Sequence, residues 1–148
     1  MGDPQPVGGL TQTQMNHAAV IVRVGQQLQM QQRAYVIAIA TALQESSLRN
    51  LANQAVPESL YYPHDGLGAD HDSLGLFQQR PSTGWGSAAE LMDPATAARK
   101  FYQALAQVAG WQDMTLAQAA QAVQISAFPE AYAQHEPLAT LVVDVLAN

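Results

Sequence analysis

The chain has 148 residues, of which 48% are hydrophobic and 12% charged, and this composition excludes a disordered, solvated polymer. Six basic residues stand against twelve acidic ones, which argues against a nucleic-acid-binding protein because such proteins need a cationic surface. The absence of cysteine excludes disulfides and thiolate metal sites and leaves the compartment open. A chain of this length is expected to form one domain, which we place at residues 11–148.

Residues 1–10, MGDPQPVGGL, are rich in proline and glycine and are interpreted as a linker or as the start of an excised domain. They have neither the basic segment nor the apolar segment of a secretory leader. No apolar run in the chain approaches the ~20 residues that cross a bilayer. We therefore expect no membrane span, and we expect this domain to come from a longer parent protein with other modules.

Two helices are predicted in the first third of the chain. Apolar residues recur at helical spacing from Thr11 to about Gln29, with Thr11 or Thr13 as the expected N-cap. Residues 33–46 form a second helix that is apolar around most of its circumference, a pattern typical of a buried central helix. This helix ends in Glu45 and Ser46, so a carboxylate terminates one of the most apolar segments of the chain.

Residues 47–74 are polar and rich in turn-forming residues, and loops of this length inside compact domains are usually functional. We expect one small β-hairpin in the 60–76 region. Four later segments begin with helix-start signals. The signals are Asp93 followed by Pro94, then Thr115, Pro129 and Pro137. The chain is therefore predicted to be mainly α-helical.

Glu45 is the first candidate for chemistry. Burial beside Leu43 and the negative end of the helix dipole both disfavour the anion of a carboxyl group at this position. Both effects predict a carboxylic acid that can donate a proton near neutral pH. A single glutamate at a helix end is also compatible with simple exposure to water, so Glu45 has to be considered together with its neighbours in the chain.

Three segments follow one another in an informative order. Glu45-Ser46 closes the apolar helix, the stretch GLFQ follows at residues 75–78, and a helix beginning DPATAARKFYQAL starts at Asp93. This order resembles the lysozyme-like superfamily of peptidoglycan-cleaving enzymes, in particular the soluble lytic transglycosylases and the goose-type lysozymes. The resemblance spans about residues 33–132 and implies a lysozyme-like fold.

The resemblance also implies roles for individual residues. Glu45 would be the general acid/base that cleaves the bond between N-acetylmuramic acid and N-acetylglucosamine. Ser46 would contact the substrate or help to place Glu45, and Gln78 would hydrogen-bond a sugar. One wall of the cleft would be formed by the backbone of Gly75, Leu76 and Phe77. The alternative for these three residues is turn geometry for the glycine and core packing for the other two.

Two aromatic residues have open interpretations. In the family, a tyrosine in a later AAYNAG-like motif reaches toward the catalytic acid, and the counterpart of that tyrosine here is Val123. Tyr132 is then either the source of this ring from another backbone position or an ordinary half-buried tyrosine. Trp85, just after the GLFQ stretch, is a candidate to stack on a sugar or to pack in the core.

The reaction depends on a second carboxylate. An inverting hydrolase needs a second carboxylate ~6.5–9.5 Å from the acid, and a retaining hydrolase needs a second carboxylate at ~5–5.5 Å. A lytic transglycosylase needs neither, because a hydroxyl of the sugar itself attacks the anomeric carbon. Arg80 occupies the position of one helper aspartate of the goose-type enzymes. The loop before the GLFQ stretch offers Asp70 and Asp72 for the other, with Asp65 and Glu58 more distant. A lytic transglycosylase is favoured, with a hydrolytic muramidase as the alternative.

The loop before the GLFQ stretch also contains metal-ligand residue types: His64, Asp65, Asp70, His71 and Asp72. Their spacing matches no metal-site pattern that we can name, so we expect neither a metal nor a cofactor. A metal-dependent hydrolase and a non-catalytic wall-binding or assembly module remain as rival functions. Peptidoglycan strands as the partner imply an extracellular or cell-envelope location, or delivery by a phage.

Overall fold

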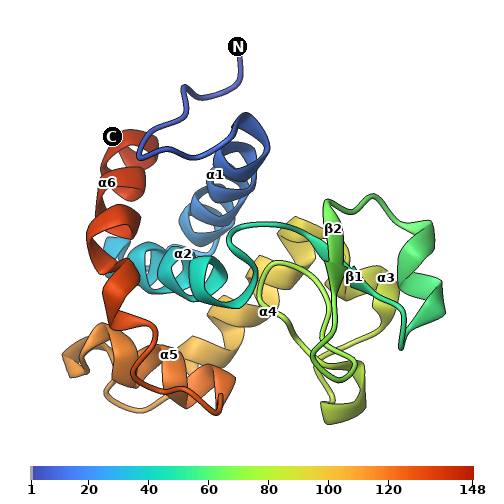
Figure 1. The fold of residues 1–148 in the computed structure, drawn as a ribbon. Helices are drawn as coiled ribbons and strands as arrows, with labels where there is room; N and C mark the ends of the chain where they lie inside the picture. The colour runs from blue at the N-terminus through green and yellow to red at the C-terminus, as the bar shows by residue number, and fades with distance from the viewer. Residues whose placement is uncertain (1) are drawn as a thin grey trace.

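The computed structural model describes residues 2–148, which form a mainly helical protein with one small sheet (Figure 1). The predicted fold class is confirmed at this level. The helices are α1 (Gln12–Gln27), α2 (Gln32–Ser46), α3 (Ala88–Leu91), α4 (Pro94–Ala106), α5 (Leu116–Gln124) and α6 (Glu136–Ala147). The strands are β1 (Leu51–Asn53) and β2 (Gly66–Gly68). Among the described residues, no helix is long and apolar enough to cross a membrane.

Helix α2 lies at the centre of the helical part, as its apolar composition predicts. It packs against α1, α4, α5 and α6, and every residue from Ile37 to Leu43 is buried. Burial on all sides explains why the sequence of α2 shows no polar face. The helix ends where Ser47 adopts a left-handed conformation with φ of 56°. This ending places Glu45 in the last turn, at the edge of the core.

Local capping signals set the starts of the helices. Thr11 caps α1, Asp93 caps α4 with Pro94 at the first helical position, and Thr115 caps α5. These predicted starts are confirmed. Helix α6 begins at Glu136, one residue before the predicted Pro137, and the segment after Pro129 forms turns and a short 3-10 helix, Ala133–His135.

The predicted hairpin in the 60–76 region is wrong. Strands β1 and β2 pair in parallel, with Leu51 opposite Gly66 and Asn53 opposite Gly68. Parallel strands need a crossover connection rather than a tight turn, and here the connection contains the 3-10 helix Pro57–Tyr61. Helix α3 was not predicted, although Ser87 and Glu90 form a capping box that the sequence displays.

The structure has two parts, and Figure 1 shows the helical one on the left and the one with the strands on the right. The helical half comprises α1, α2, α4, α5 and α6. The small lobe comprises residues 50–92, with β1, β2 and α3. The C-terminal end of α2 points to the junction of these two parts, and the candidate residues for chemistry gather there.

Candidate active site

Glu45 is held by two hydrogen bonds from distant parts of the chain. Its Oε2 accepts a hydrogen bond of 2.8 Å from the hydroxyl of Tyr132 and one of 2.9 Å from Nε2 of Gln124. Within residues 2–148, no hydrogen bond involves Oε1. The side chain is half-buried, so its surroundings are less apolar than the sequence of α2 alone predicts. One carboxyl oxygen is therefore anchored while the other remains available.

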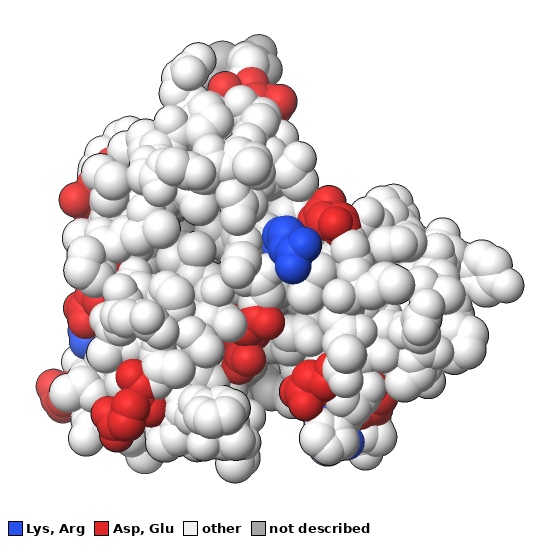
Figure 2. All heavy atoms as spheres, in the orientation of Figure 1, with Lys and Arg blue, Asp and Glu red and all other residues white. Residues whose placement is uncertain are grey.

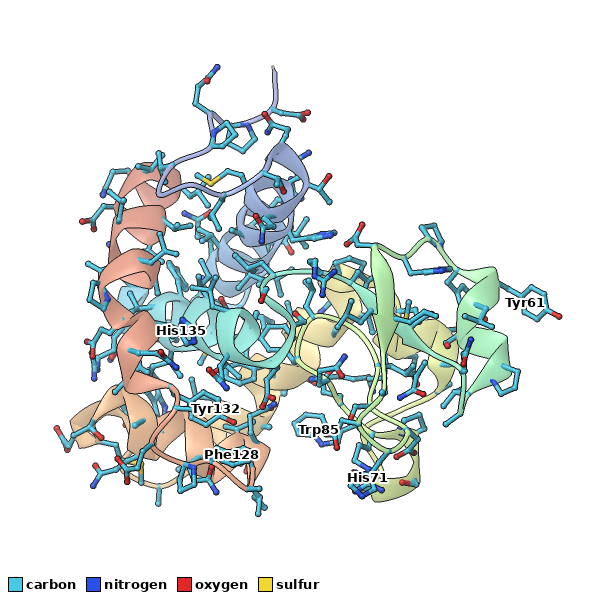
Figure 3. The ribbon with its side chains drawn as sticks, viewed as in Figure 1. Tyr61, His71, Trp85, Phe128, Tyr132 and His135 are labelled. Atoms are coloured by element: carbon cyan, nitrogen blue, oxygen red, sulfur yellow. The ribbon has the colours of Figure 1, made fainter. Side chains whose placement is uncertain are left out.

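Tyr132 is the tyrosine that contacts Glu45, which decides between the two interpretations of this residue. Its ring is completely buried, and Figure 3 shows it on the helical half below the end of α2. Burial raises the pKa of the Tyr132 hydroxyl well above its usual value, and the nearby charge of Glu45 adds to this effect. The hydroxyl therefore stays protonated and remains a hydrogen-bond donor. Val123, at the position expected from the family motif, is buried.

Gln124 is a site residue that the sequence analysis did not identify. Its Nε2 donates to Glu45 and also to the backbone carbonyl of Phe77 at 2.8 Å. It thus links the acid to the GLFQ stretch. The signal was present, because Gln124 follows Val123 just as an asparagine follows the tyrosine in the family motif, and both side chains carry an amide.

Two adjoining pockets lie beside Glu45, and we call them together the groove. The acidic pocket, of about 390 Å³, is lined by Glu45, Asp70, His71, Ser73, Ser126, Ala127 and Phe128. The tryptophan pocket, of about 500 Å³, is lined by Thr83, Trp85 and Val123. Both are also lined by Gln78, Arg80, Gln124 and Ile125. In Figure 3, Phe128 on the helical half lies across from Trp85 and His71 on the other side.

The GLFQ stretch contributes to the groove through one side chain only. Gln78 lines both pockets, and its sugar contact stays a prediction. Leu76 and Phe77 are fully buried, and Phe77 stacks on Phe101 with ring centroids 4.8 Å apart. None of residues 75–77 lines either pocket, so the groove shows no wall formed by their backbone, and Leu76 and Phe77 pack in the core.

Gly75 is required for turn geometry. Its φ is +80°, a conformation that favours glycine, and a Cβ atom there would lie 2.3 Å from the carbonyl oxygen of Leu91. The turn that it begins is closed by an antiparallel bridge between Leu74 and Gln79. This turn places the side chain of Gln78 in the groove, where its Nε2 donates to the Gly75 carbonyl at 2.9 Å.

Ser46 does not line the groove. It is buried, and its hydroxyl lies within hydrogen-bonding distance of the carbonyl oxygens of Leu76, at 2.7 Å, and Ala42, at 3.1 Å. The predicted substrate contact is therefore wrong, whereas the alternative, a role in placing Glu45, fits the geometry. The serine fastens the end of α2 to the GLFQ stretch.

Trp85 and two apolar residues line the groove from different sides. Trp85 is half-buried and packs against the cores of both parts of the protein, which confirms the packing interpretation. It also lines the tryptophan pocket, and its stacking on a sugar stays a prediction. Ile125 and Phe128 are 80% and 71% exposed and were not predicted as site residues. Ile125 has φ of 49°, an uncommon conformation for a β-branched residue. Exposed apolar side chains at a groove suit the apolar faces of a ligand.

The two candidate second carboxylates differ in their surroundings. Asp70 is exposed and lines the acidic pocket together with Glu45, with Oδ1 2.8 Å from Nδ1 of His71. Asp72 accepts a 2.6 Å hydrogen bond from Nε of Arg80 and a 2.8 Å one from the backbone of Ser82. The Arg80 guanidinium holds the pKa of Asp72 well below its usual range. Because Asp72 does not line the groove, Asp70 is the better placed candidate.

The residues of the loop at 64–72 whose types could bind a metal contact other groups of the protein. His64 bonds the carbonyl of Tyr62 through Nδ1, and Asp65 contacts Nε2 of His17 at 2.7 Å. Within residues 2–148, no group of three or more His, Cys, Asp or Glu side chains is arranged to hold a metal ion.

Comparisons with known proteins identify no relative: no family model matches the chain, and a search of curated proteins found no match. Function is therefore inferred from the residues of the groove and from their geometry. The site consists of the half-buried carboxyl of Glu45, which has one free oxygen, and of the two hydrogen-bond donors that orient this carboxyl. The groove beside it combines polar amides with aromatic and aliphatic side chains.

Proposed function

We propose that this protein cleaves the glycosidic bond between N-acetylmuramic acid and N-acetylglucosamine in bacterial peptidoglycan, as a lytic transglycosylase with Glu45 as the single general acid/base. The observation that carries the proposal is the position of Glu45 beside a groove, with Oε2 bound by Tyr132 and Gln124 and with Oε1 free. The order of the Glu45-Ser46 and GLFQ segments supports it. Such a substrate places the protein outside the cell or in the envelope.

The free oxygen of Glu45 suits both halves of the reaction. Oε1 first gives its proton to the glycosidic oxygen while the bond from that oxygen to the anomeric carbon breaks. The resulting carboxylate then accepts the proton of a hydroxyl on the same muramic acid ring, while that hydroxyl oxygen bonds to the anomeric carbon. The two steps need one carboxyl group only, and the product is an anhydro-muramic acid end.

The rest of the groove favours a cationic transition state. Glycosidic cleavage passes through an oxocarbenium-like state, which nearby negative charge stabilises. Glu45 and Asp70 both line the acidic pocket, and Figure 2 shows that acidic side chains outnumber basic ones on this face of the molecule. Tyr132 and Gln124 fix the orientation of the Glu45 carboxyl, so that little reorganisation is needed when the bond breaks.

A hydrolytic muramidase is the second candidate, and the position of Asp70 favours it. Asp70 shares the acidic pocket with Glu45 and is exposed, so it is placed to activate a water molecule. The products separate the two reactions, because hydrolysis leaves a reducing muramic acid end whereas transglycosylation leaves an anhydro end.

The test is mass spectrometry of the products released from purified peptidoglycan. We expect anhydro-muramic ends with the wild-type protein and at least about a thousandfold less product with Glu45→Gln, which keeps the shape of the side chain but removes the acid. Glu130→Gln, at an exposed position outside the groove, is the matched control and should leave activity unchanged.

Four other outcomes would change the proposal. Reducing ends that disappear in Asp70→Asn would establish the muramidase. Activity that survives in Glu45→Gln would exclude Glu45 as the acid, and a loss of activity with a chelator would point to the metal-dependent alternative. A wild-type protein that binds peptidoglycan without cleaving it would be a wall-binding module.

A further inference from the structure

We propose that Arg80 binds a carboxylate carried by the muramic acid side of the substrate, so that the groove selects anionic glycan strands over neutral ones. This inference rests on the proposed function and deepens it, because it specifies which glycan the groove accepts. It assigns a substrate-binding role to Arg80.

Arg80 lies where the two pockets of the groove meet. It lines both of them, together with Gln78, Gln124 and Ile125. Among the lining residues of both pockets it is the only Lys or Arg. A ligand that extends from Glu45 in the acidic pocket toward Trp85 in the tryptophan pocket therefore passes this cation.

The Arg80 side chain is held in place by an ion pair. Its Nε donates to Asp72 at 2.6 Å, and Asp72 is itself fixed by the backbone N–H of Ser82. The side chains of Arg80 and Asp72 are 37% and 20% exposed. Within residues 2–148, neither terminal nitrogen of the guanidinium has a hydrogen-bond partner. Asp72 thus orients the guanidinium through one edge and leaves its outer N–H groups free.

A guanidinium in this position is chemically complementary to a carboxylate. Its parallel N–H groups match the two carboxylate oxygens, which makes arginine well suited to this recognition. The protein has a formal net charge of −6, and the acidic pocket contains Glu45 and Asp70. An anionic strand would be repelled by this field unless a local cation met its charge. Arg80 supplies that cation.

Peptidoglycan offers two sources of such a carboxylate. In a strand without peptides, the lactyl group of muramic acid ends in a free carboxylate. In a strand with peptides, that group is an amide and the carboxylates belong to the peptide. A chitin oligosaccharide, which consists of N-acetylglucosamine alone, has neither and serves as the neutral reference.

The experiment is calorimetric titration of Glu45→Gln, which does not consume its ligands, with three tetrasaccharides: chitin, the peptide-free glycan and the peptide-bearing glycan. We expect at least one anionic glycan to bind about tenfold more tightly than chitin, the size of effect typical of a charge-assisted hydrogen bond. Adding Arg80→Gln should abolish this preference and leave chitin binding unchanged. The anionic glycan that binds more weakly once Arg80→Gln is added identifies the source of the carboxylate.

Matched variants separate binding from folding. Arg99→Gln removes the same charge from an exposed position on α4 that does not line the groove, and should keep the preference. Arg80→Lys should restore part of the preference for the anionic glycan. The double variant Arg80→Gln with Asp72→Asn leaves no unpaired Asp72, and it should behave like Arg80→Gln alone. A preference that persists in Arg80→Gln, or no preference in Glu45→Gln, would overturn the inference while the proposed function stands. Failure to bind any of the three glycans would overturn both.

Discussion

The helical half and the small lobe are held together by different interactions. The helical half is built around a large apolar cluster that includes Phe101, Tyr102 and the buried residues of α2. The separate cluster of the small lobe contains Ala52, Leu74, Ala88, Leu91 and Met92. Most of the buried polar side chains of the protein lie instead between residues 50 and 79, namely Asn50, Asn53, Ser59, Ser73 and Gln79.

This contrast shows how irregular backbone can be fixed. Helices satisfy their own backbone groups, whereas buried loop carbonyls need other partners. Asn50 donates from Nδ2 to the carbonyls of Pro63 and Met92, and Asn53 donates to those of His71 and Ser73. Side-chain amides therefore hold the backbone of the small lobe in place, whereas helix hydrogen bonds and apolar packing hold the helical half in place.

The largest effect is expected from a change in the helical core. Phe101→Ala removes a fully buried ring that stacks on Phe77, and should lower the free energy of unfolding by about 3–5 kcal/mol. Urea denaturation measures this loss. Leu141→Ala, at a position 44% exposed on α6, should change the value by less than about 0.5 kcal/mol. Equal losses in both variants would contradict the assignment of stability to the apolar cluster.

A smaller and more local effect is expected in the small lobe. Asn50→Ala leaves the carbonyls of Pro63 and Met92 without their donor and should cost about 2–3 kcal/mol. Hydrogen exchange should accelerate at residues 51–68 while the amides of α1 and α2 keep their protection. Gln54→Ala, exposed in the same lobe, is the control. A uniform loss of protection in both parts would show that the two parts unfold as one unit.

The junction of the two parts is tested by the tyrosine on Glu45. Tyr132→Phe removes one of the two donors to Oε2 and should reduce the rate of glycan cleavage about tenfold, because Gln124 still orients the carboxyl. Thermal unfolding should show a loss of stability of only about 1 kcal/mol. Tyr61→Phe, at a side chain that is 87% exposed, should alter neither quantity. An unchanged rate in Tyr132→Phe would remove Tyr132 from the active site.

The smallest effect concerns the ion pair of Asp72 with Arg80, and it depends on pH. Because the pKa of Asp72 is held below its unfolded value of about 3.9, the pair contributes stability above that pH. This contribution is lost as the pH falls through the folded-state pKa. Asp72→Asn should therefore be less stable than the wild type by about 1 kcal/mol at pH 7, and the difference should shrink toward pH 2. Asp144→Asn, which removes an exposed carboxylate on α6, is the control.

Local sequence signals were sufficient to predict the helical half and the position of the acid. The caps at Thr11, Asp93 and Thr115 and the all-round apolar composition of α2 are each confined to a few neighbouring residues. Such signals are readable because a helix closes its hydrogen bonds within one turn. The same kind of local signal predicted that Glu45 lies at the end of the central helix.

The surroundings of Glu45, in contrast, depend on the tertiary fold. Tyr132 reaches it from an irregular segment 87 residues away, Gln124 reaches it from the end of α5, and Ser46 turns inward to the Leu76 carbonyl. The parallel pairing of β1 with β2 likewise depends on a crossover rather than on a local turn signal. These contacts join distant residues whose meeting depends on how the helices and loops pack, and no short-range pattern in the chain encodes that packing.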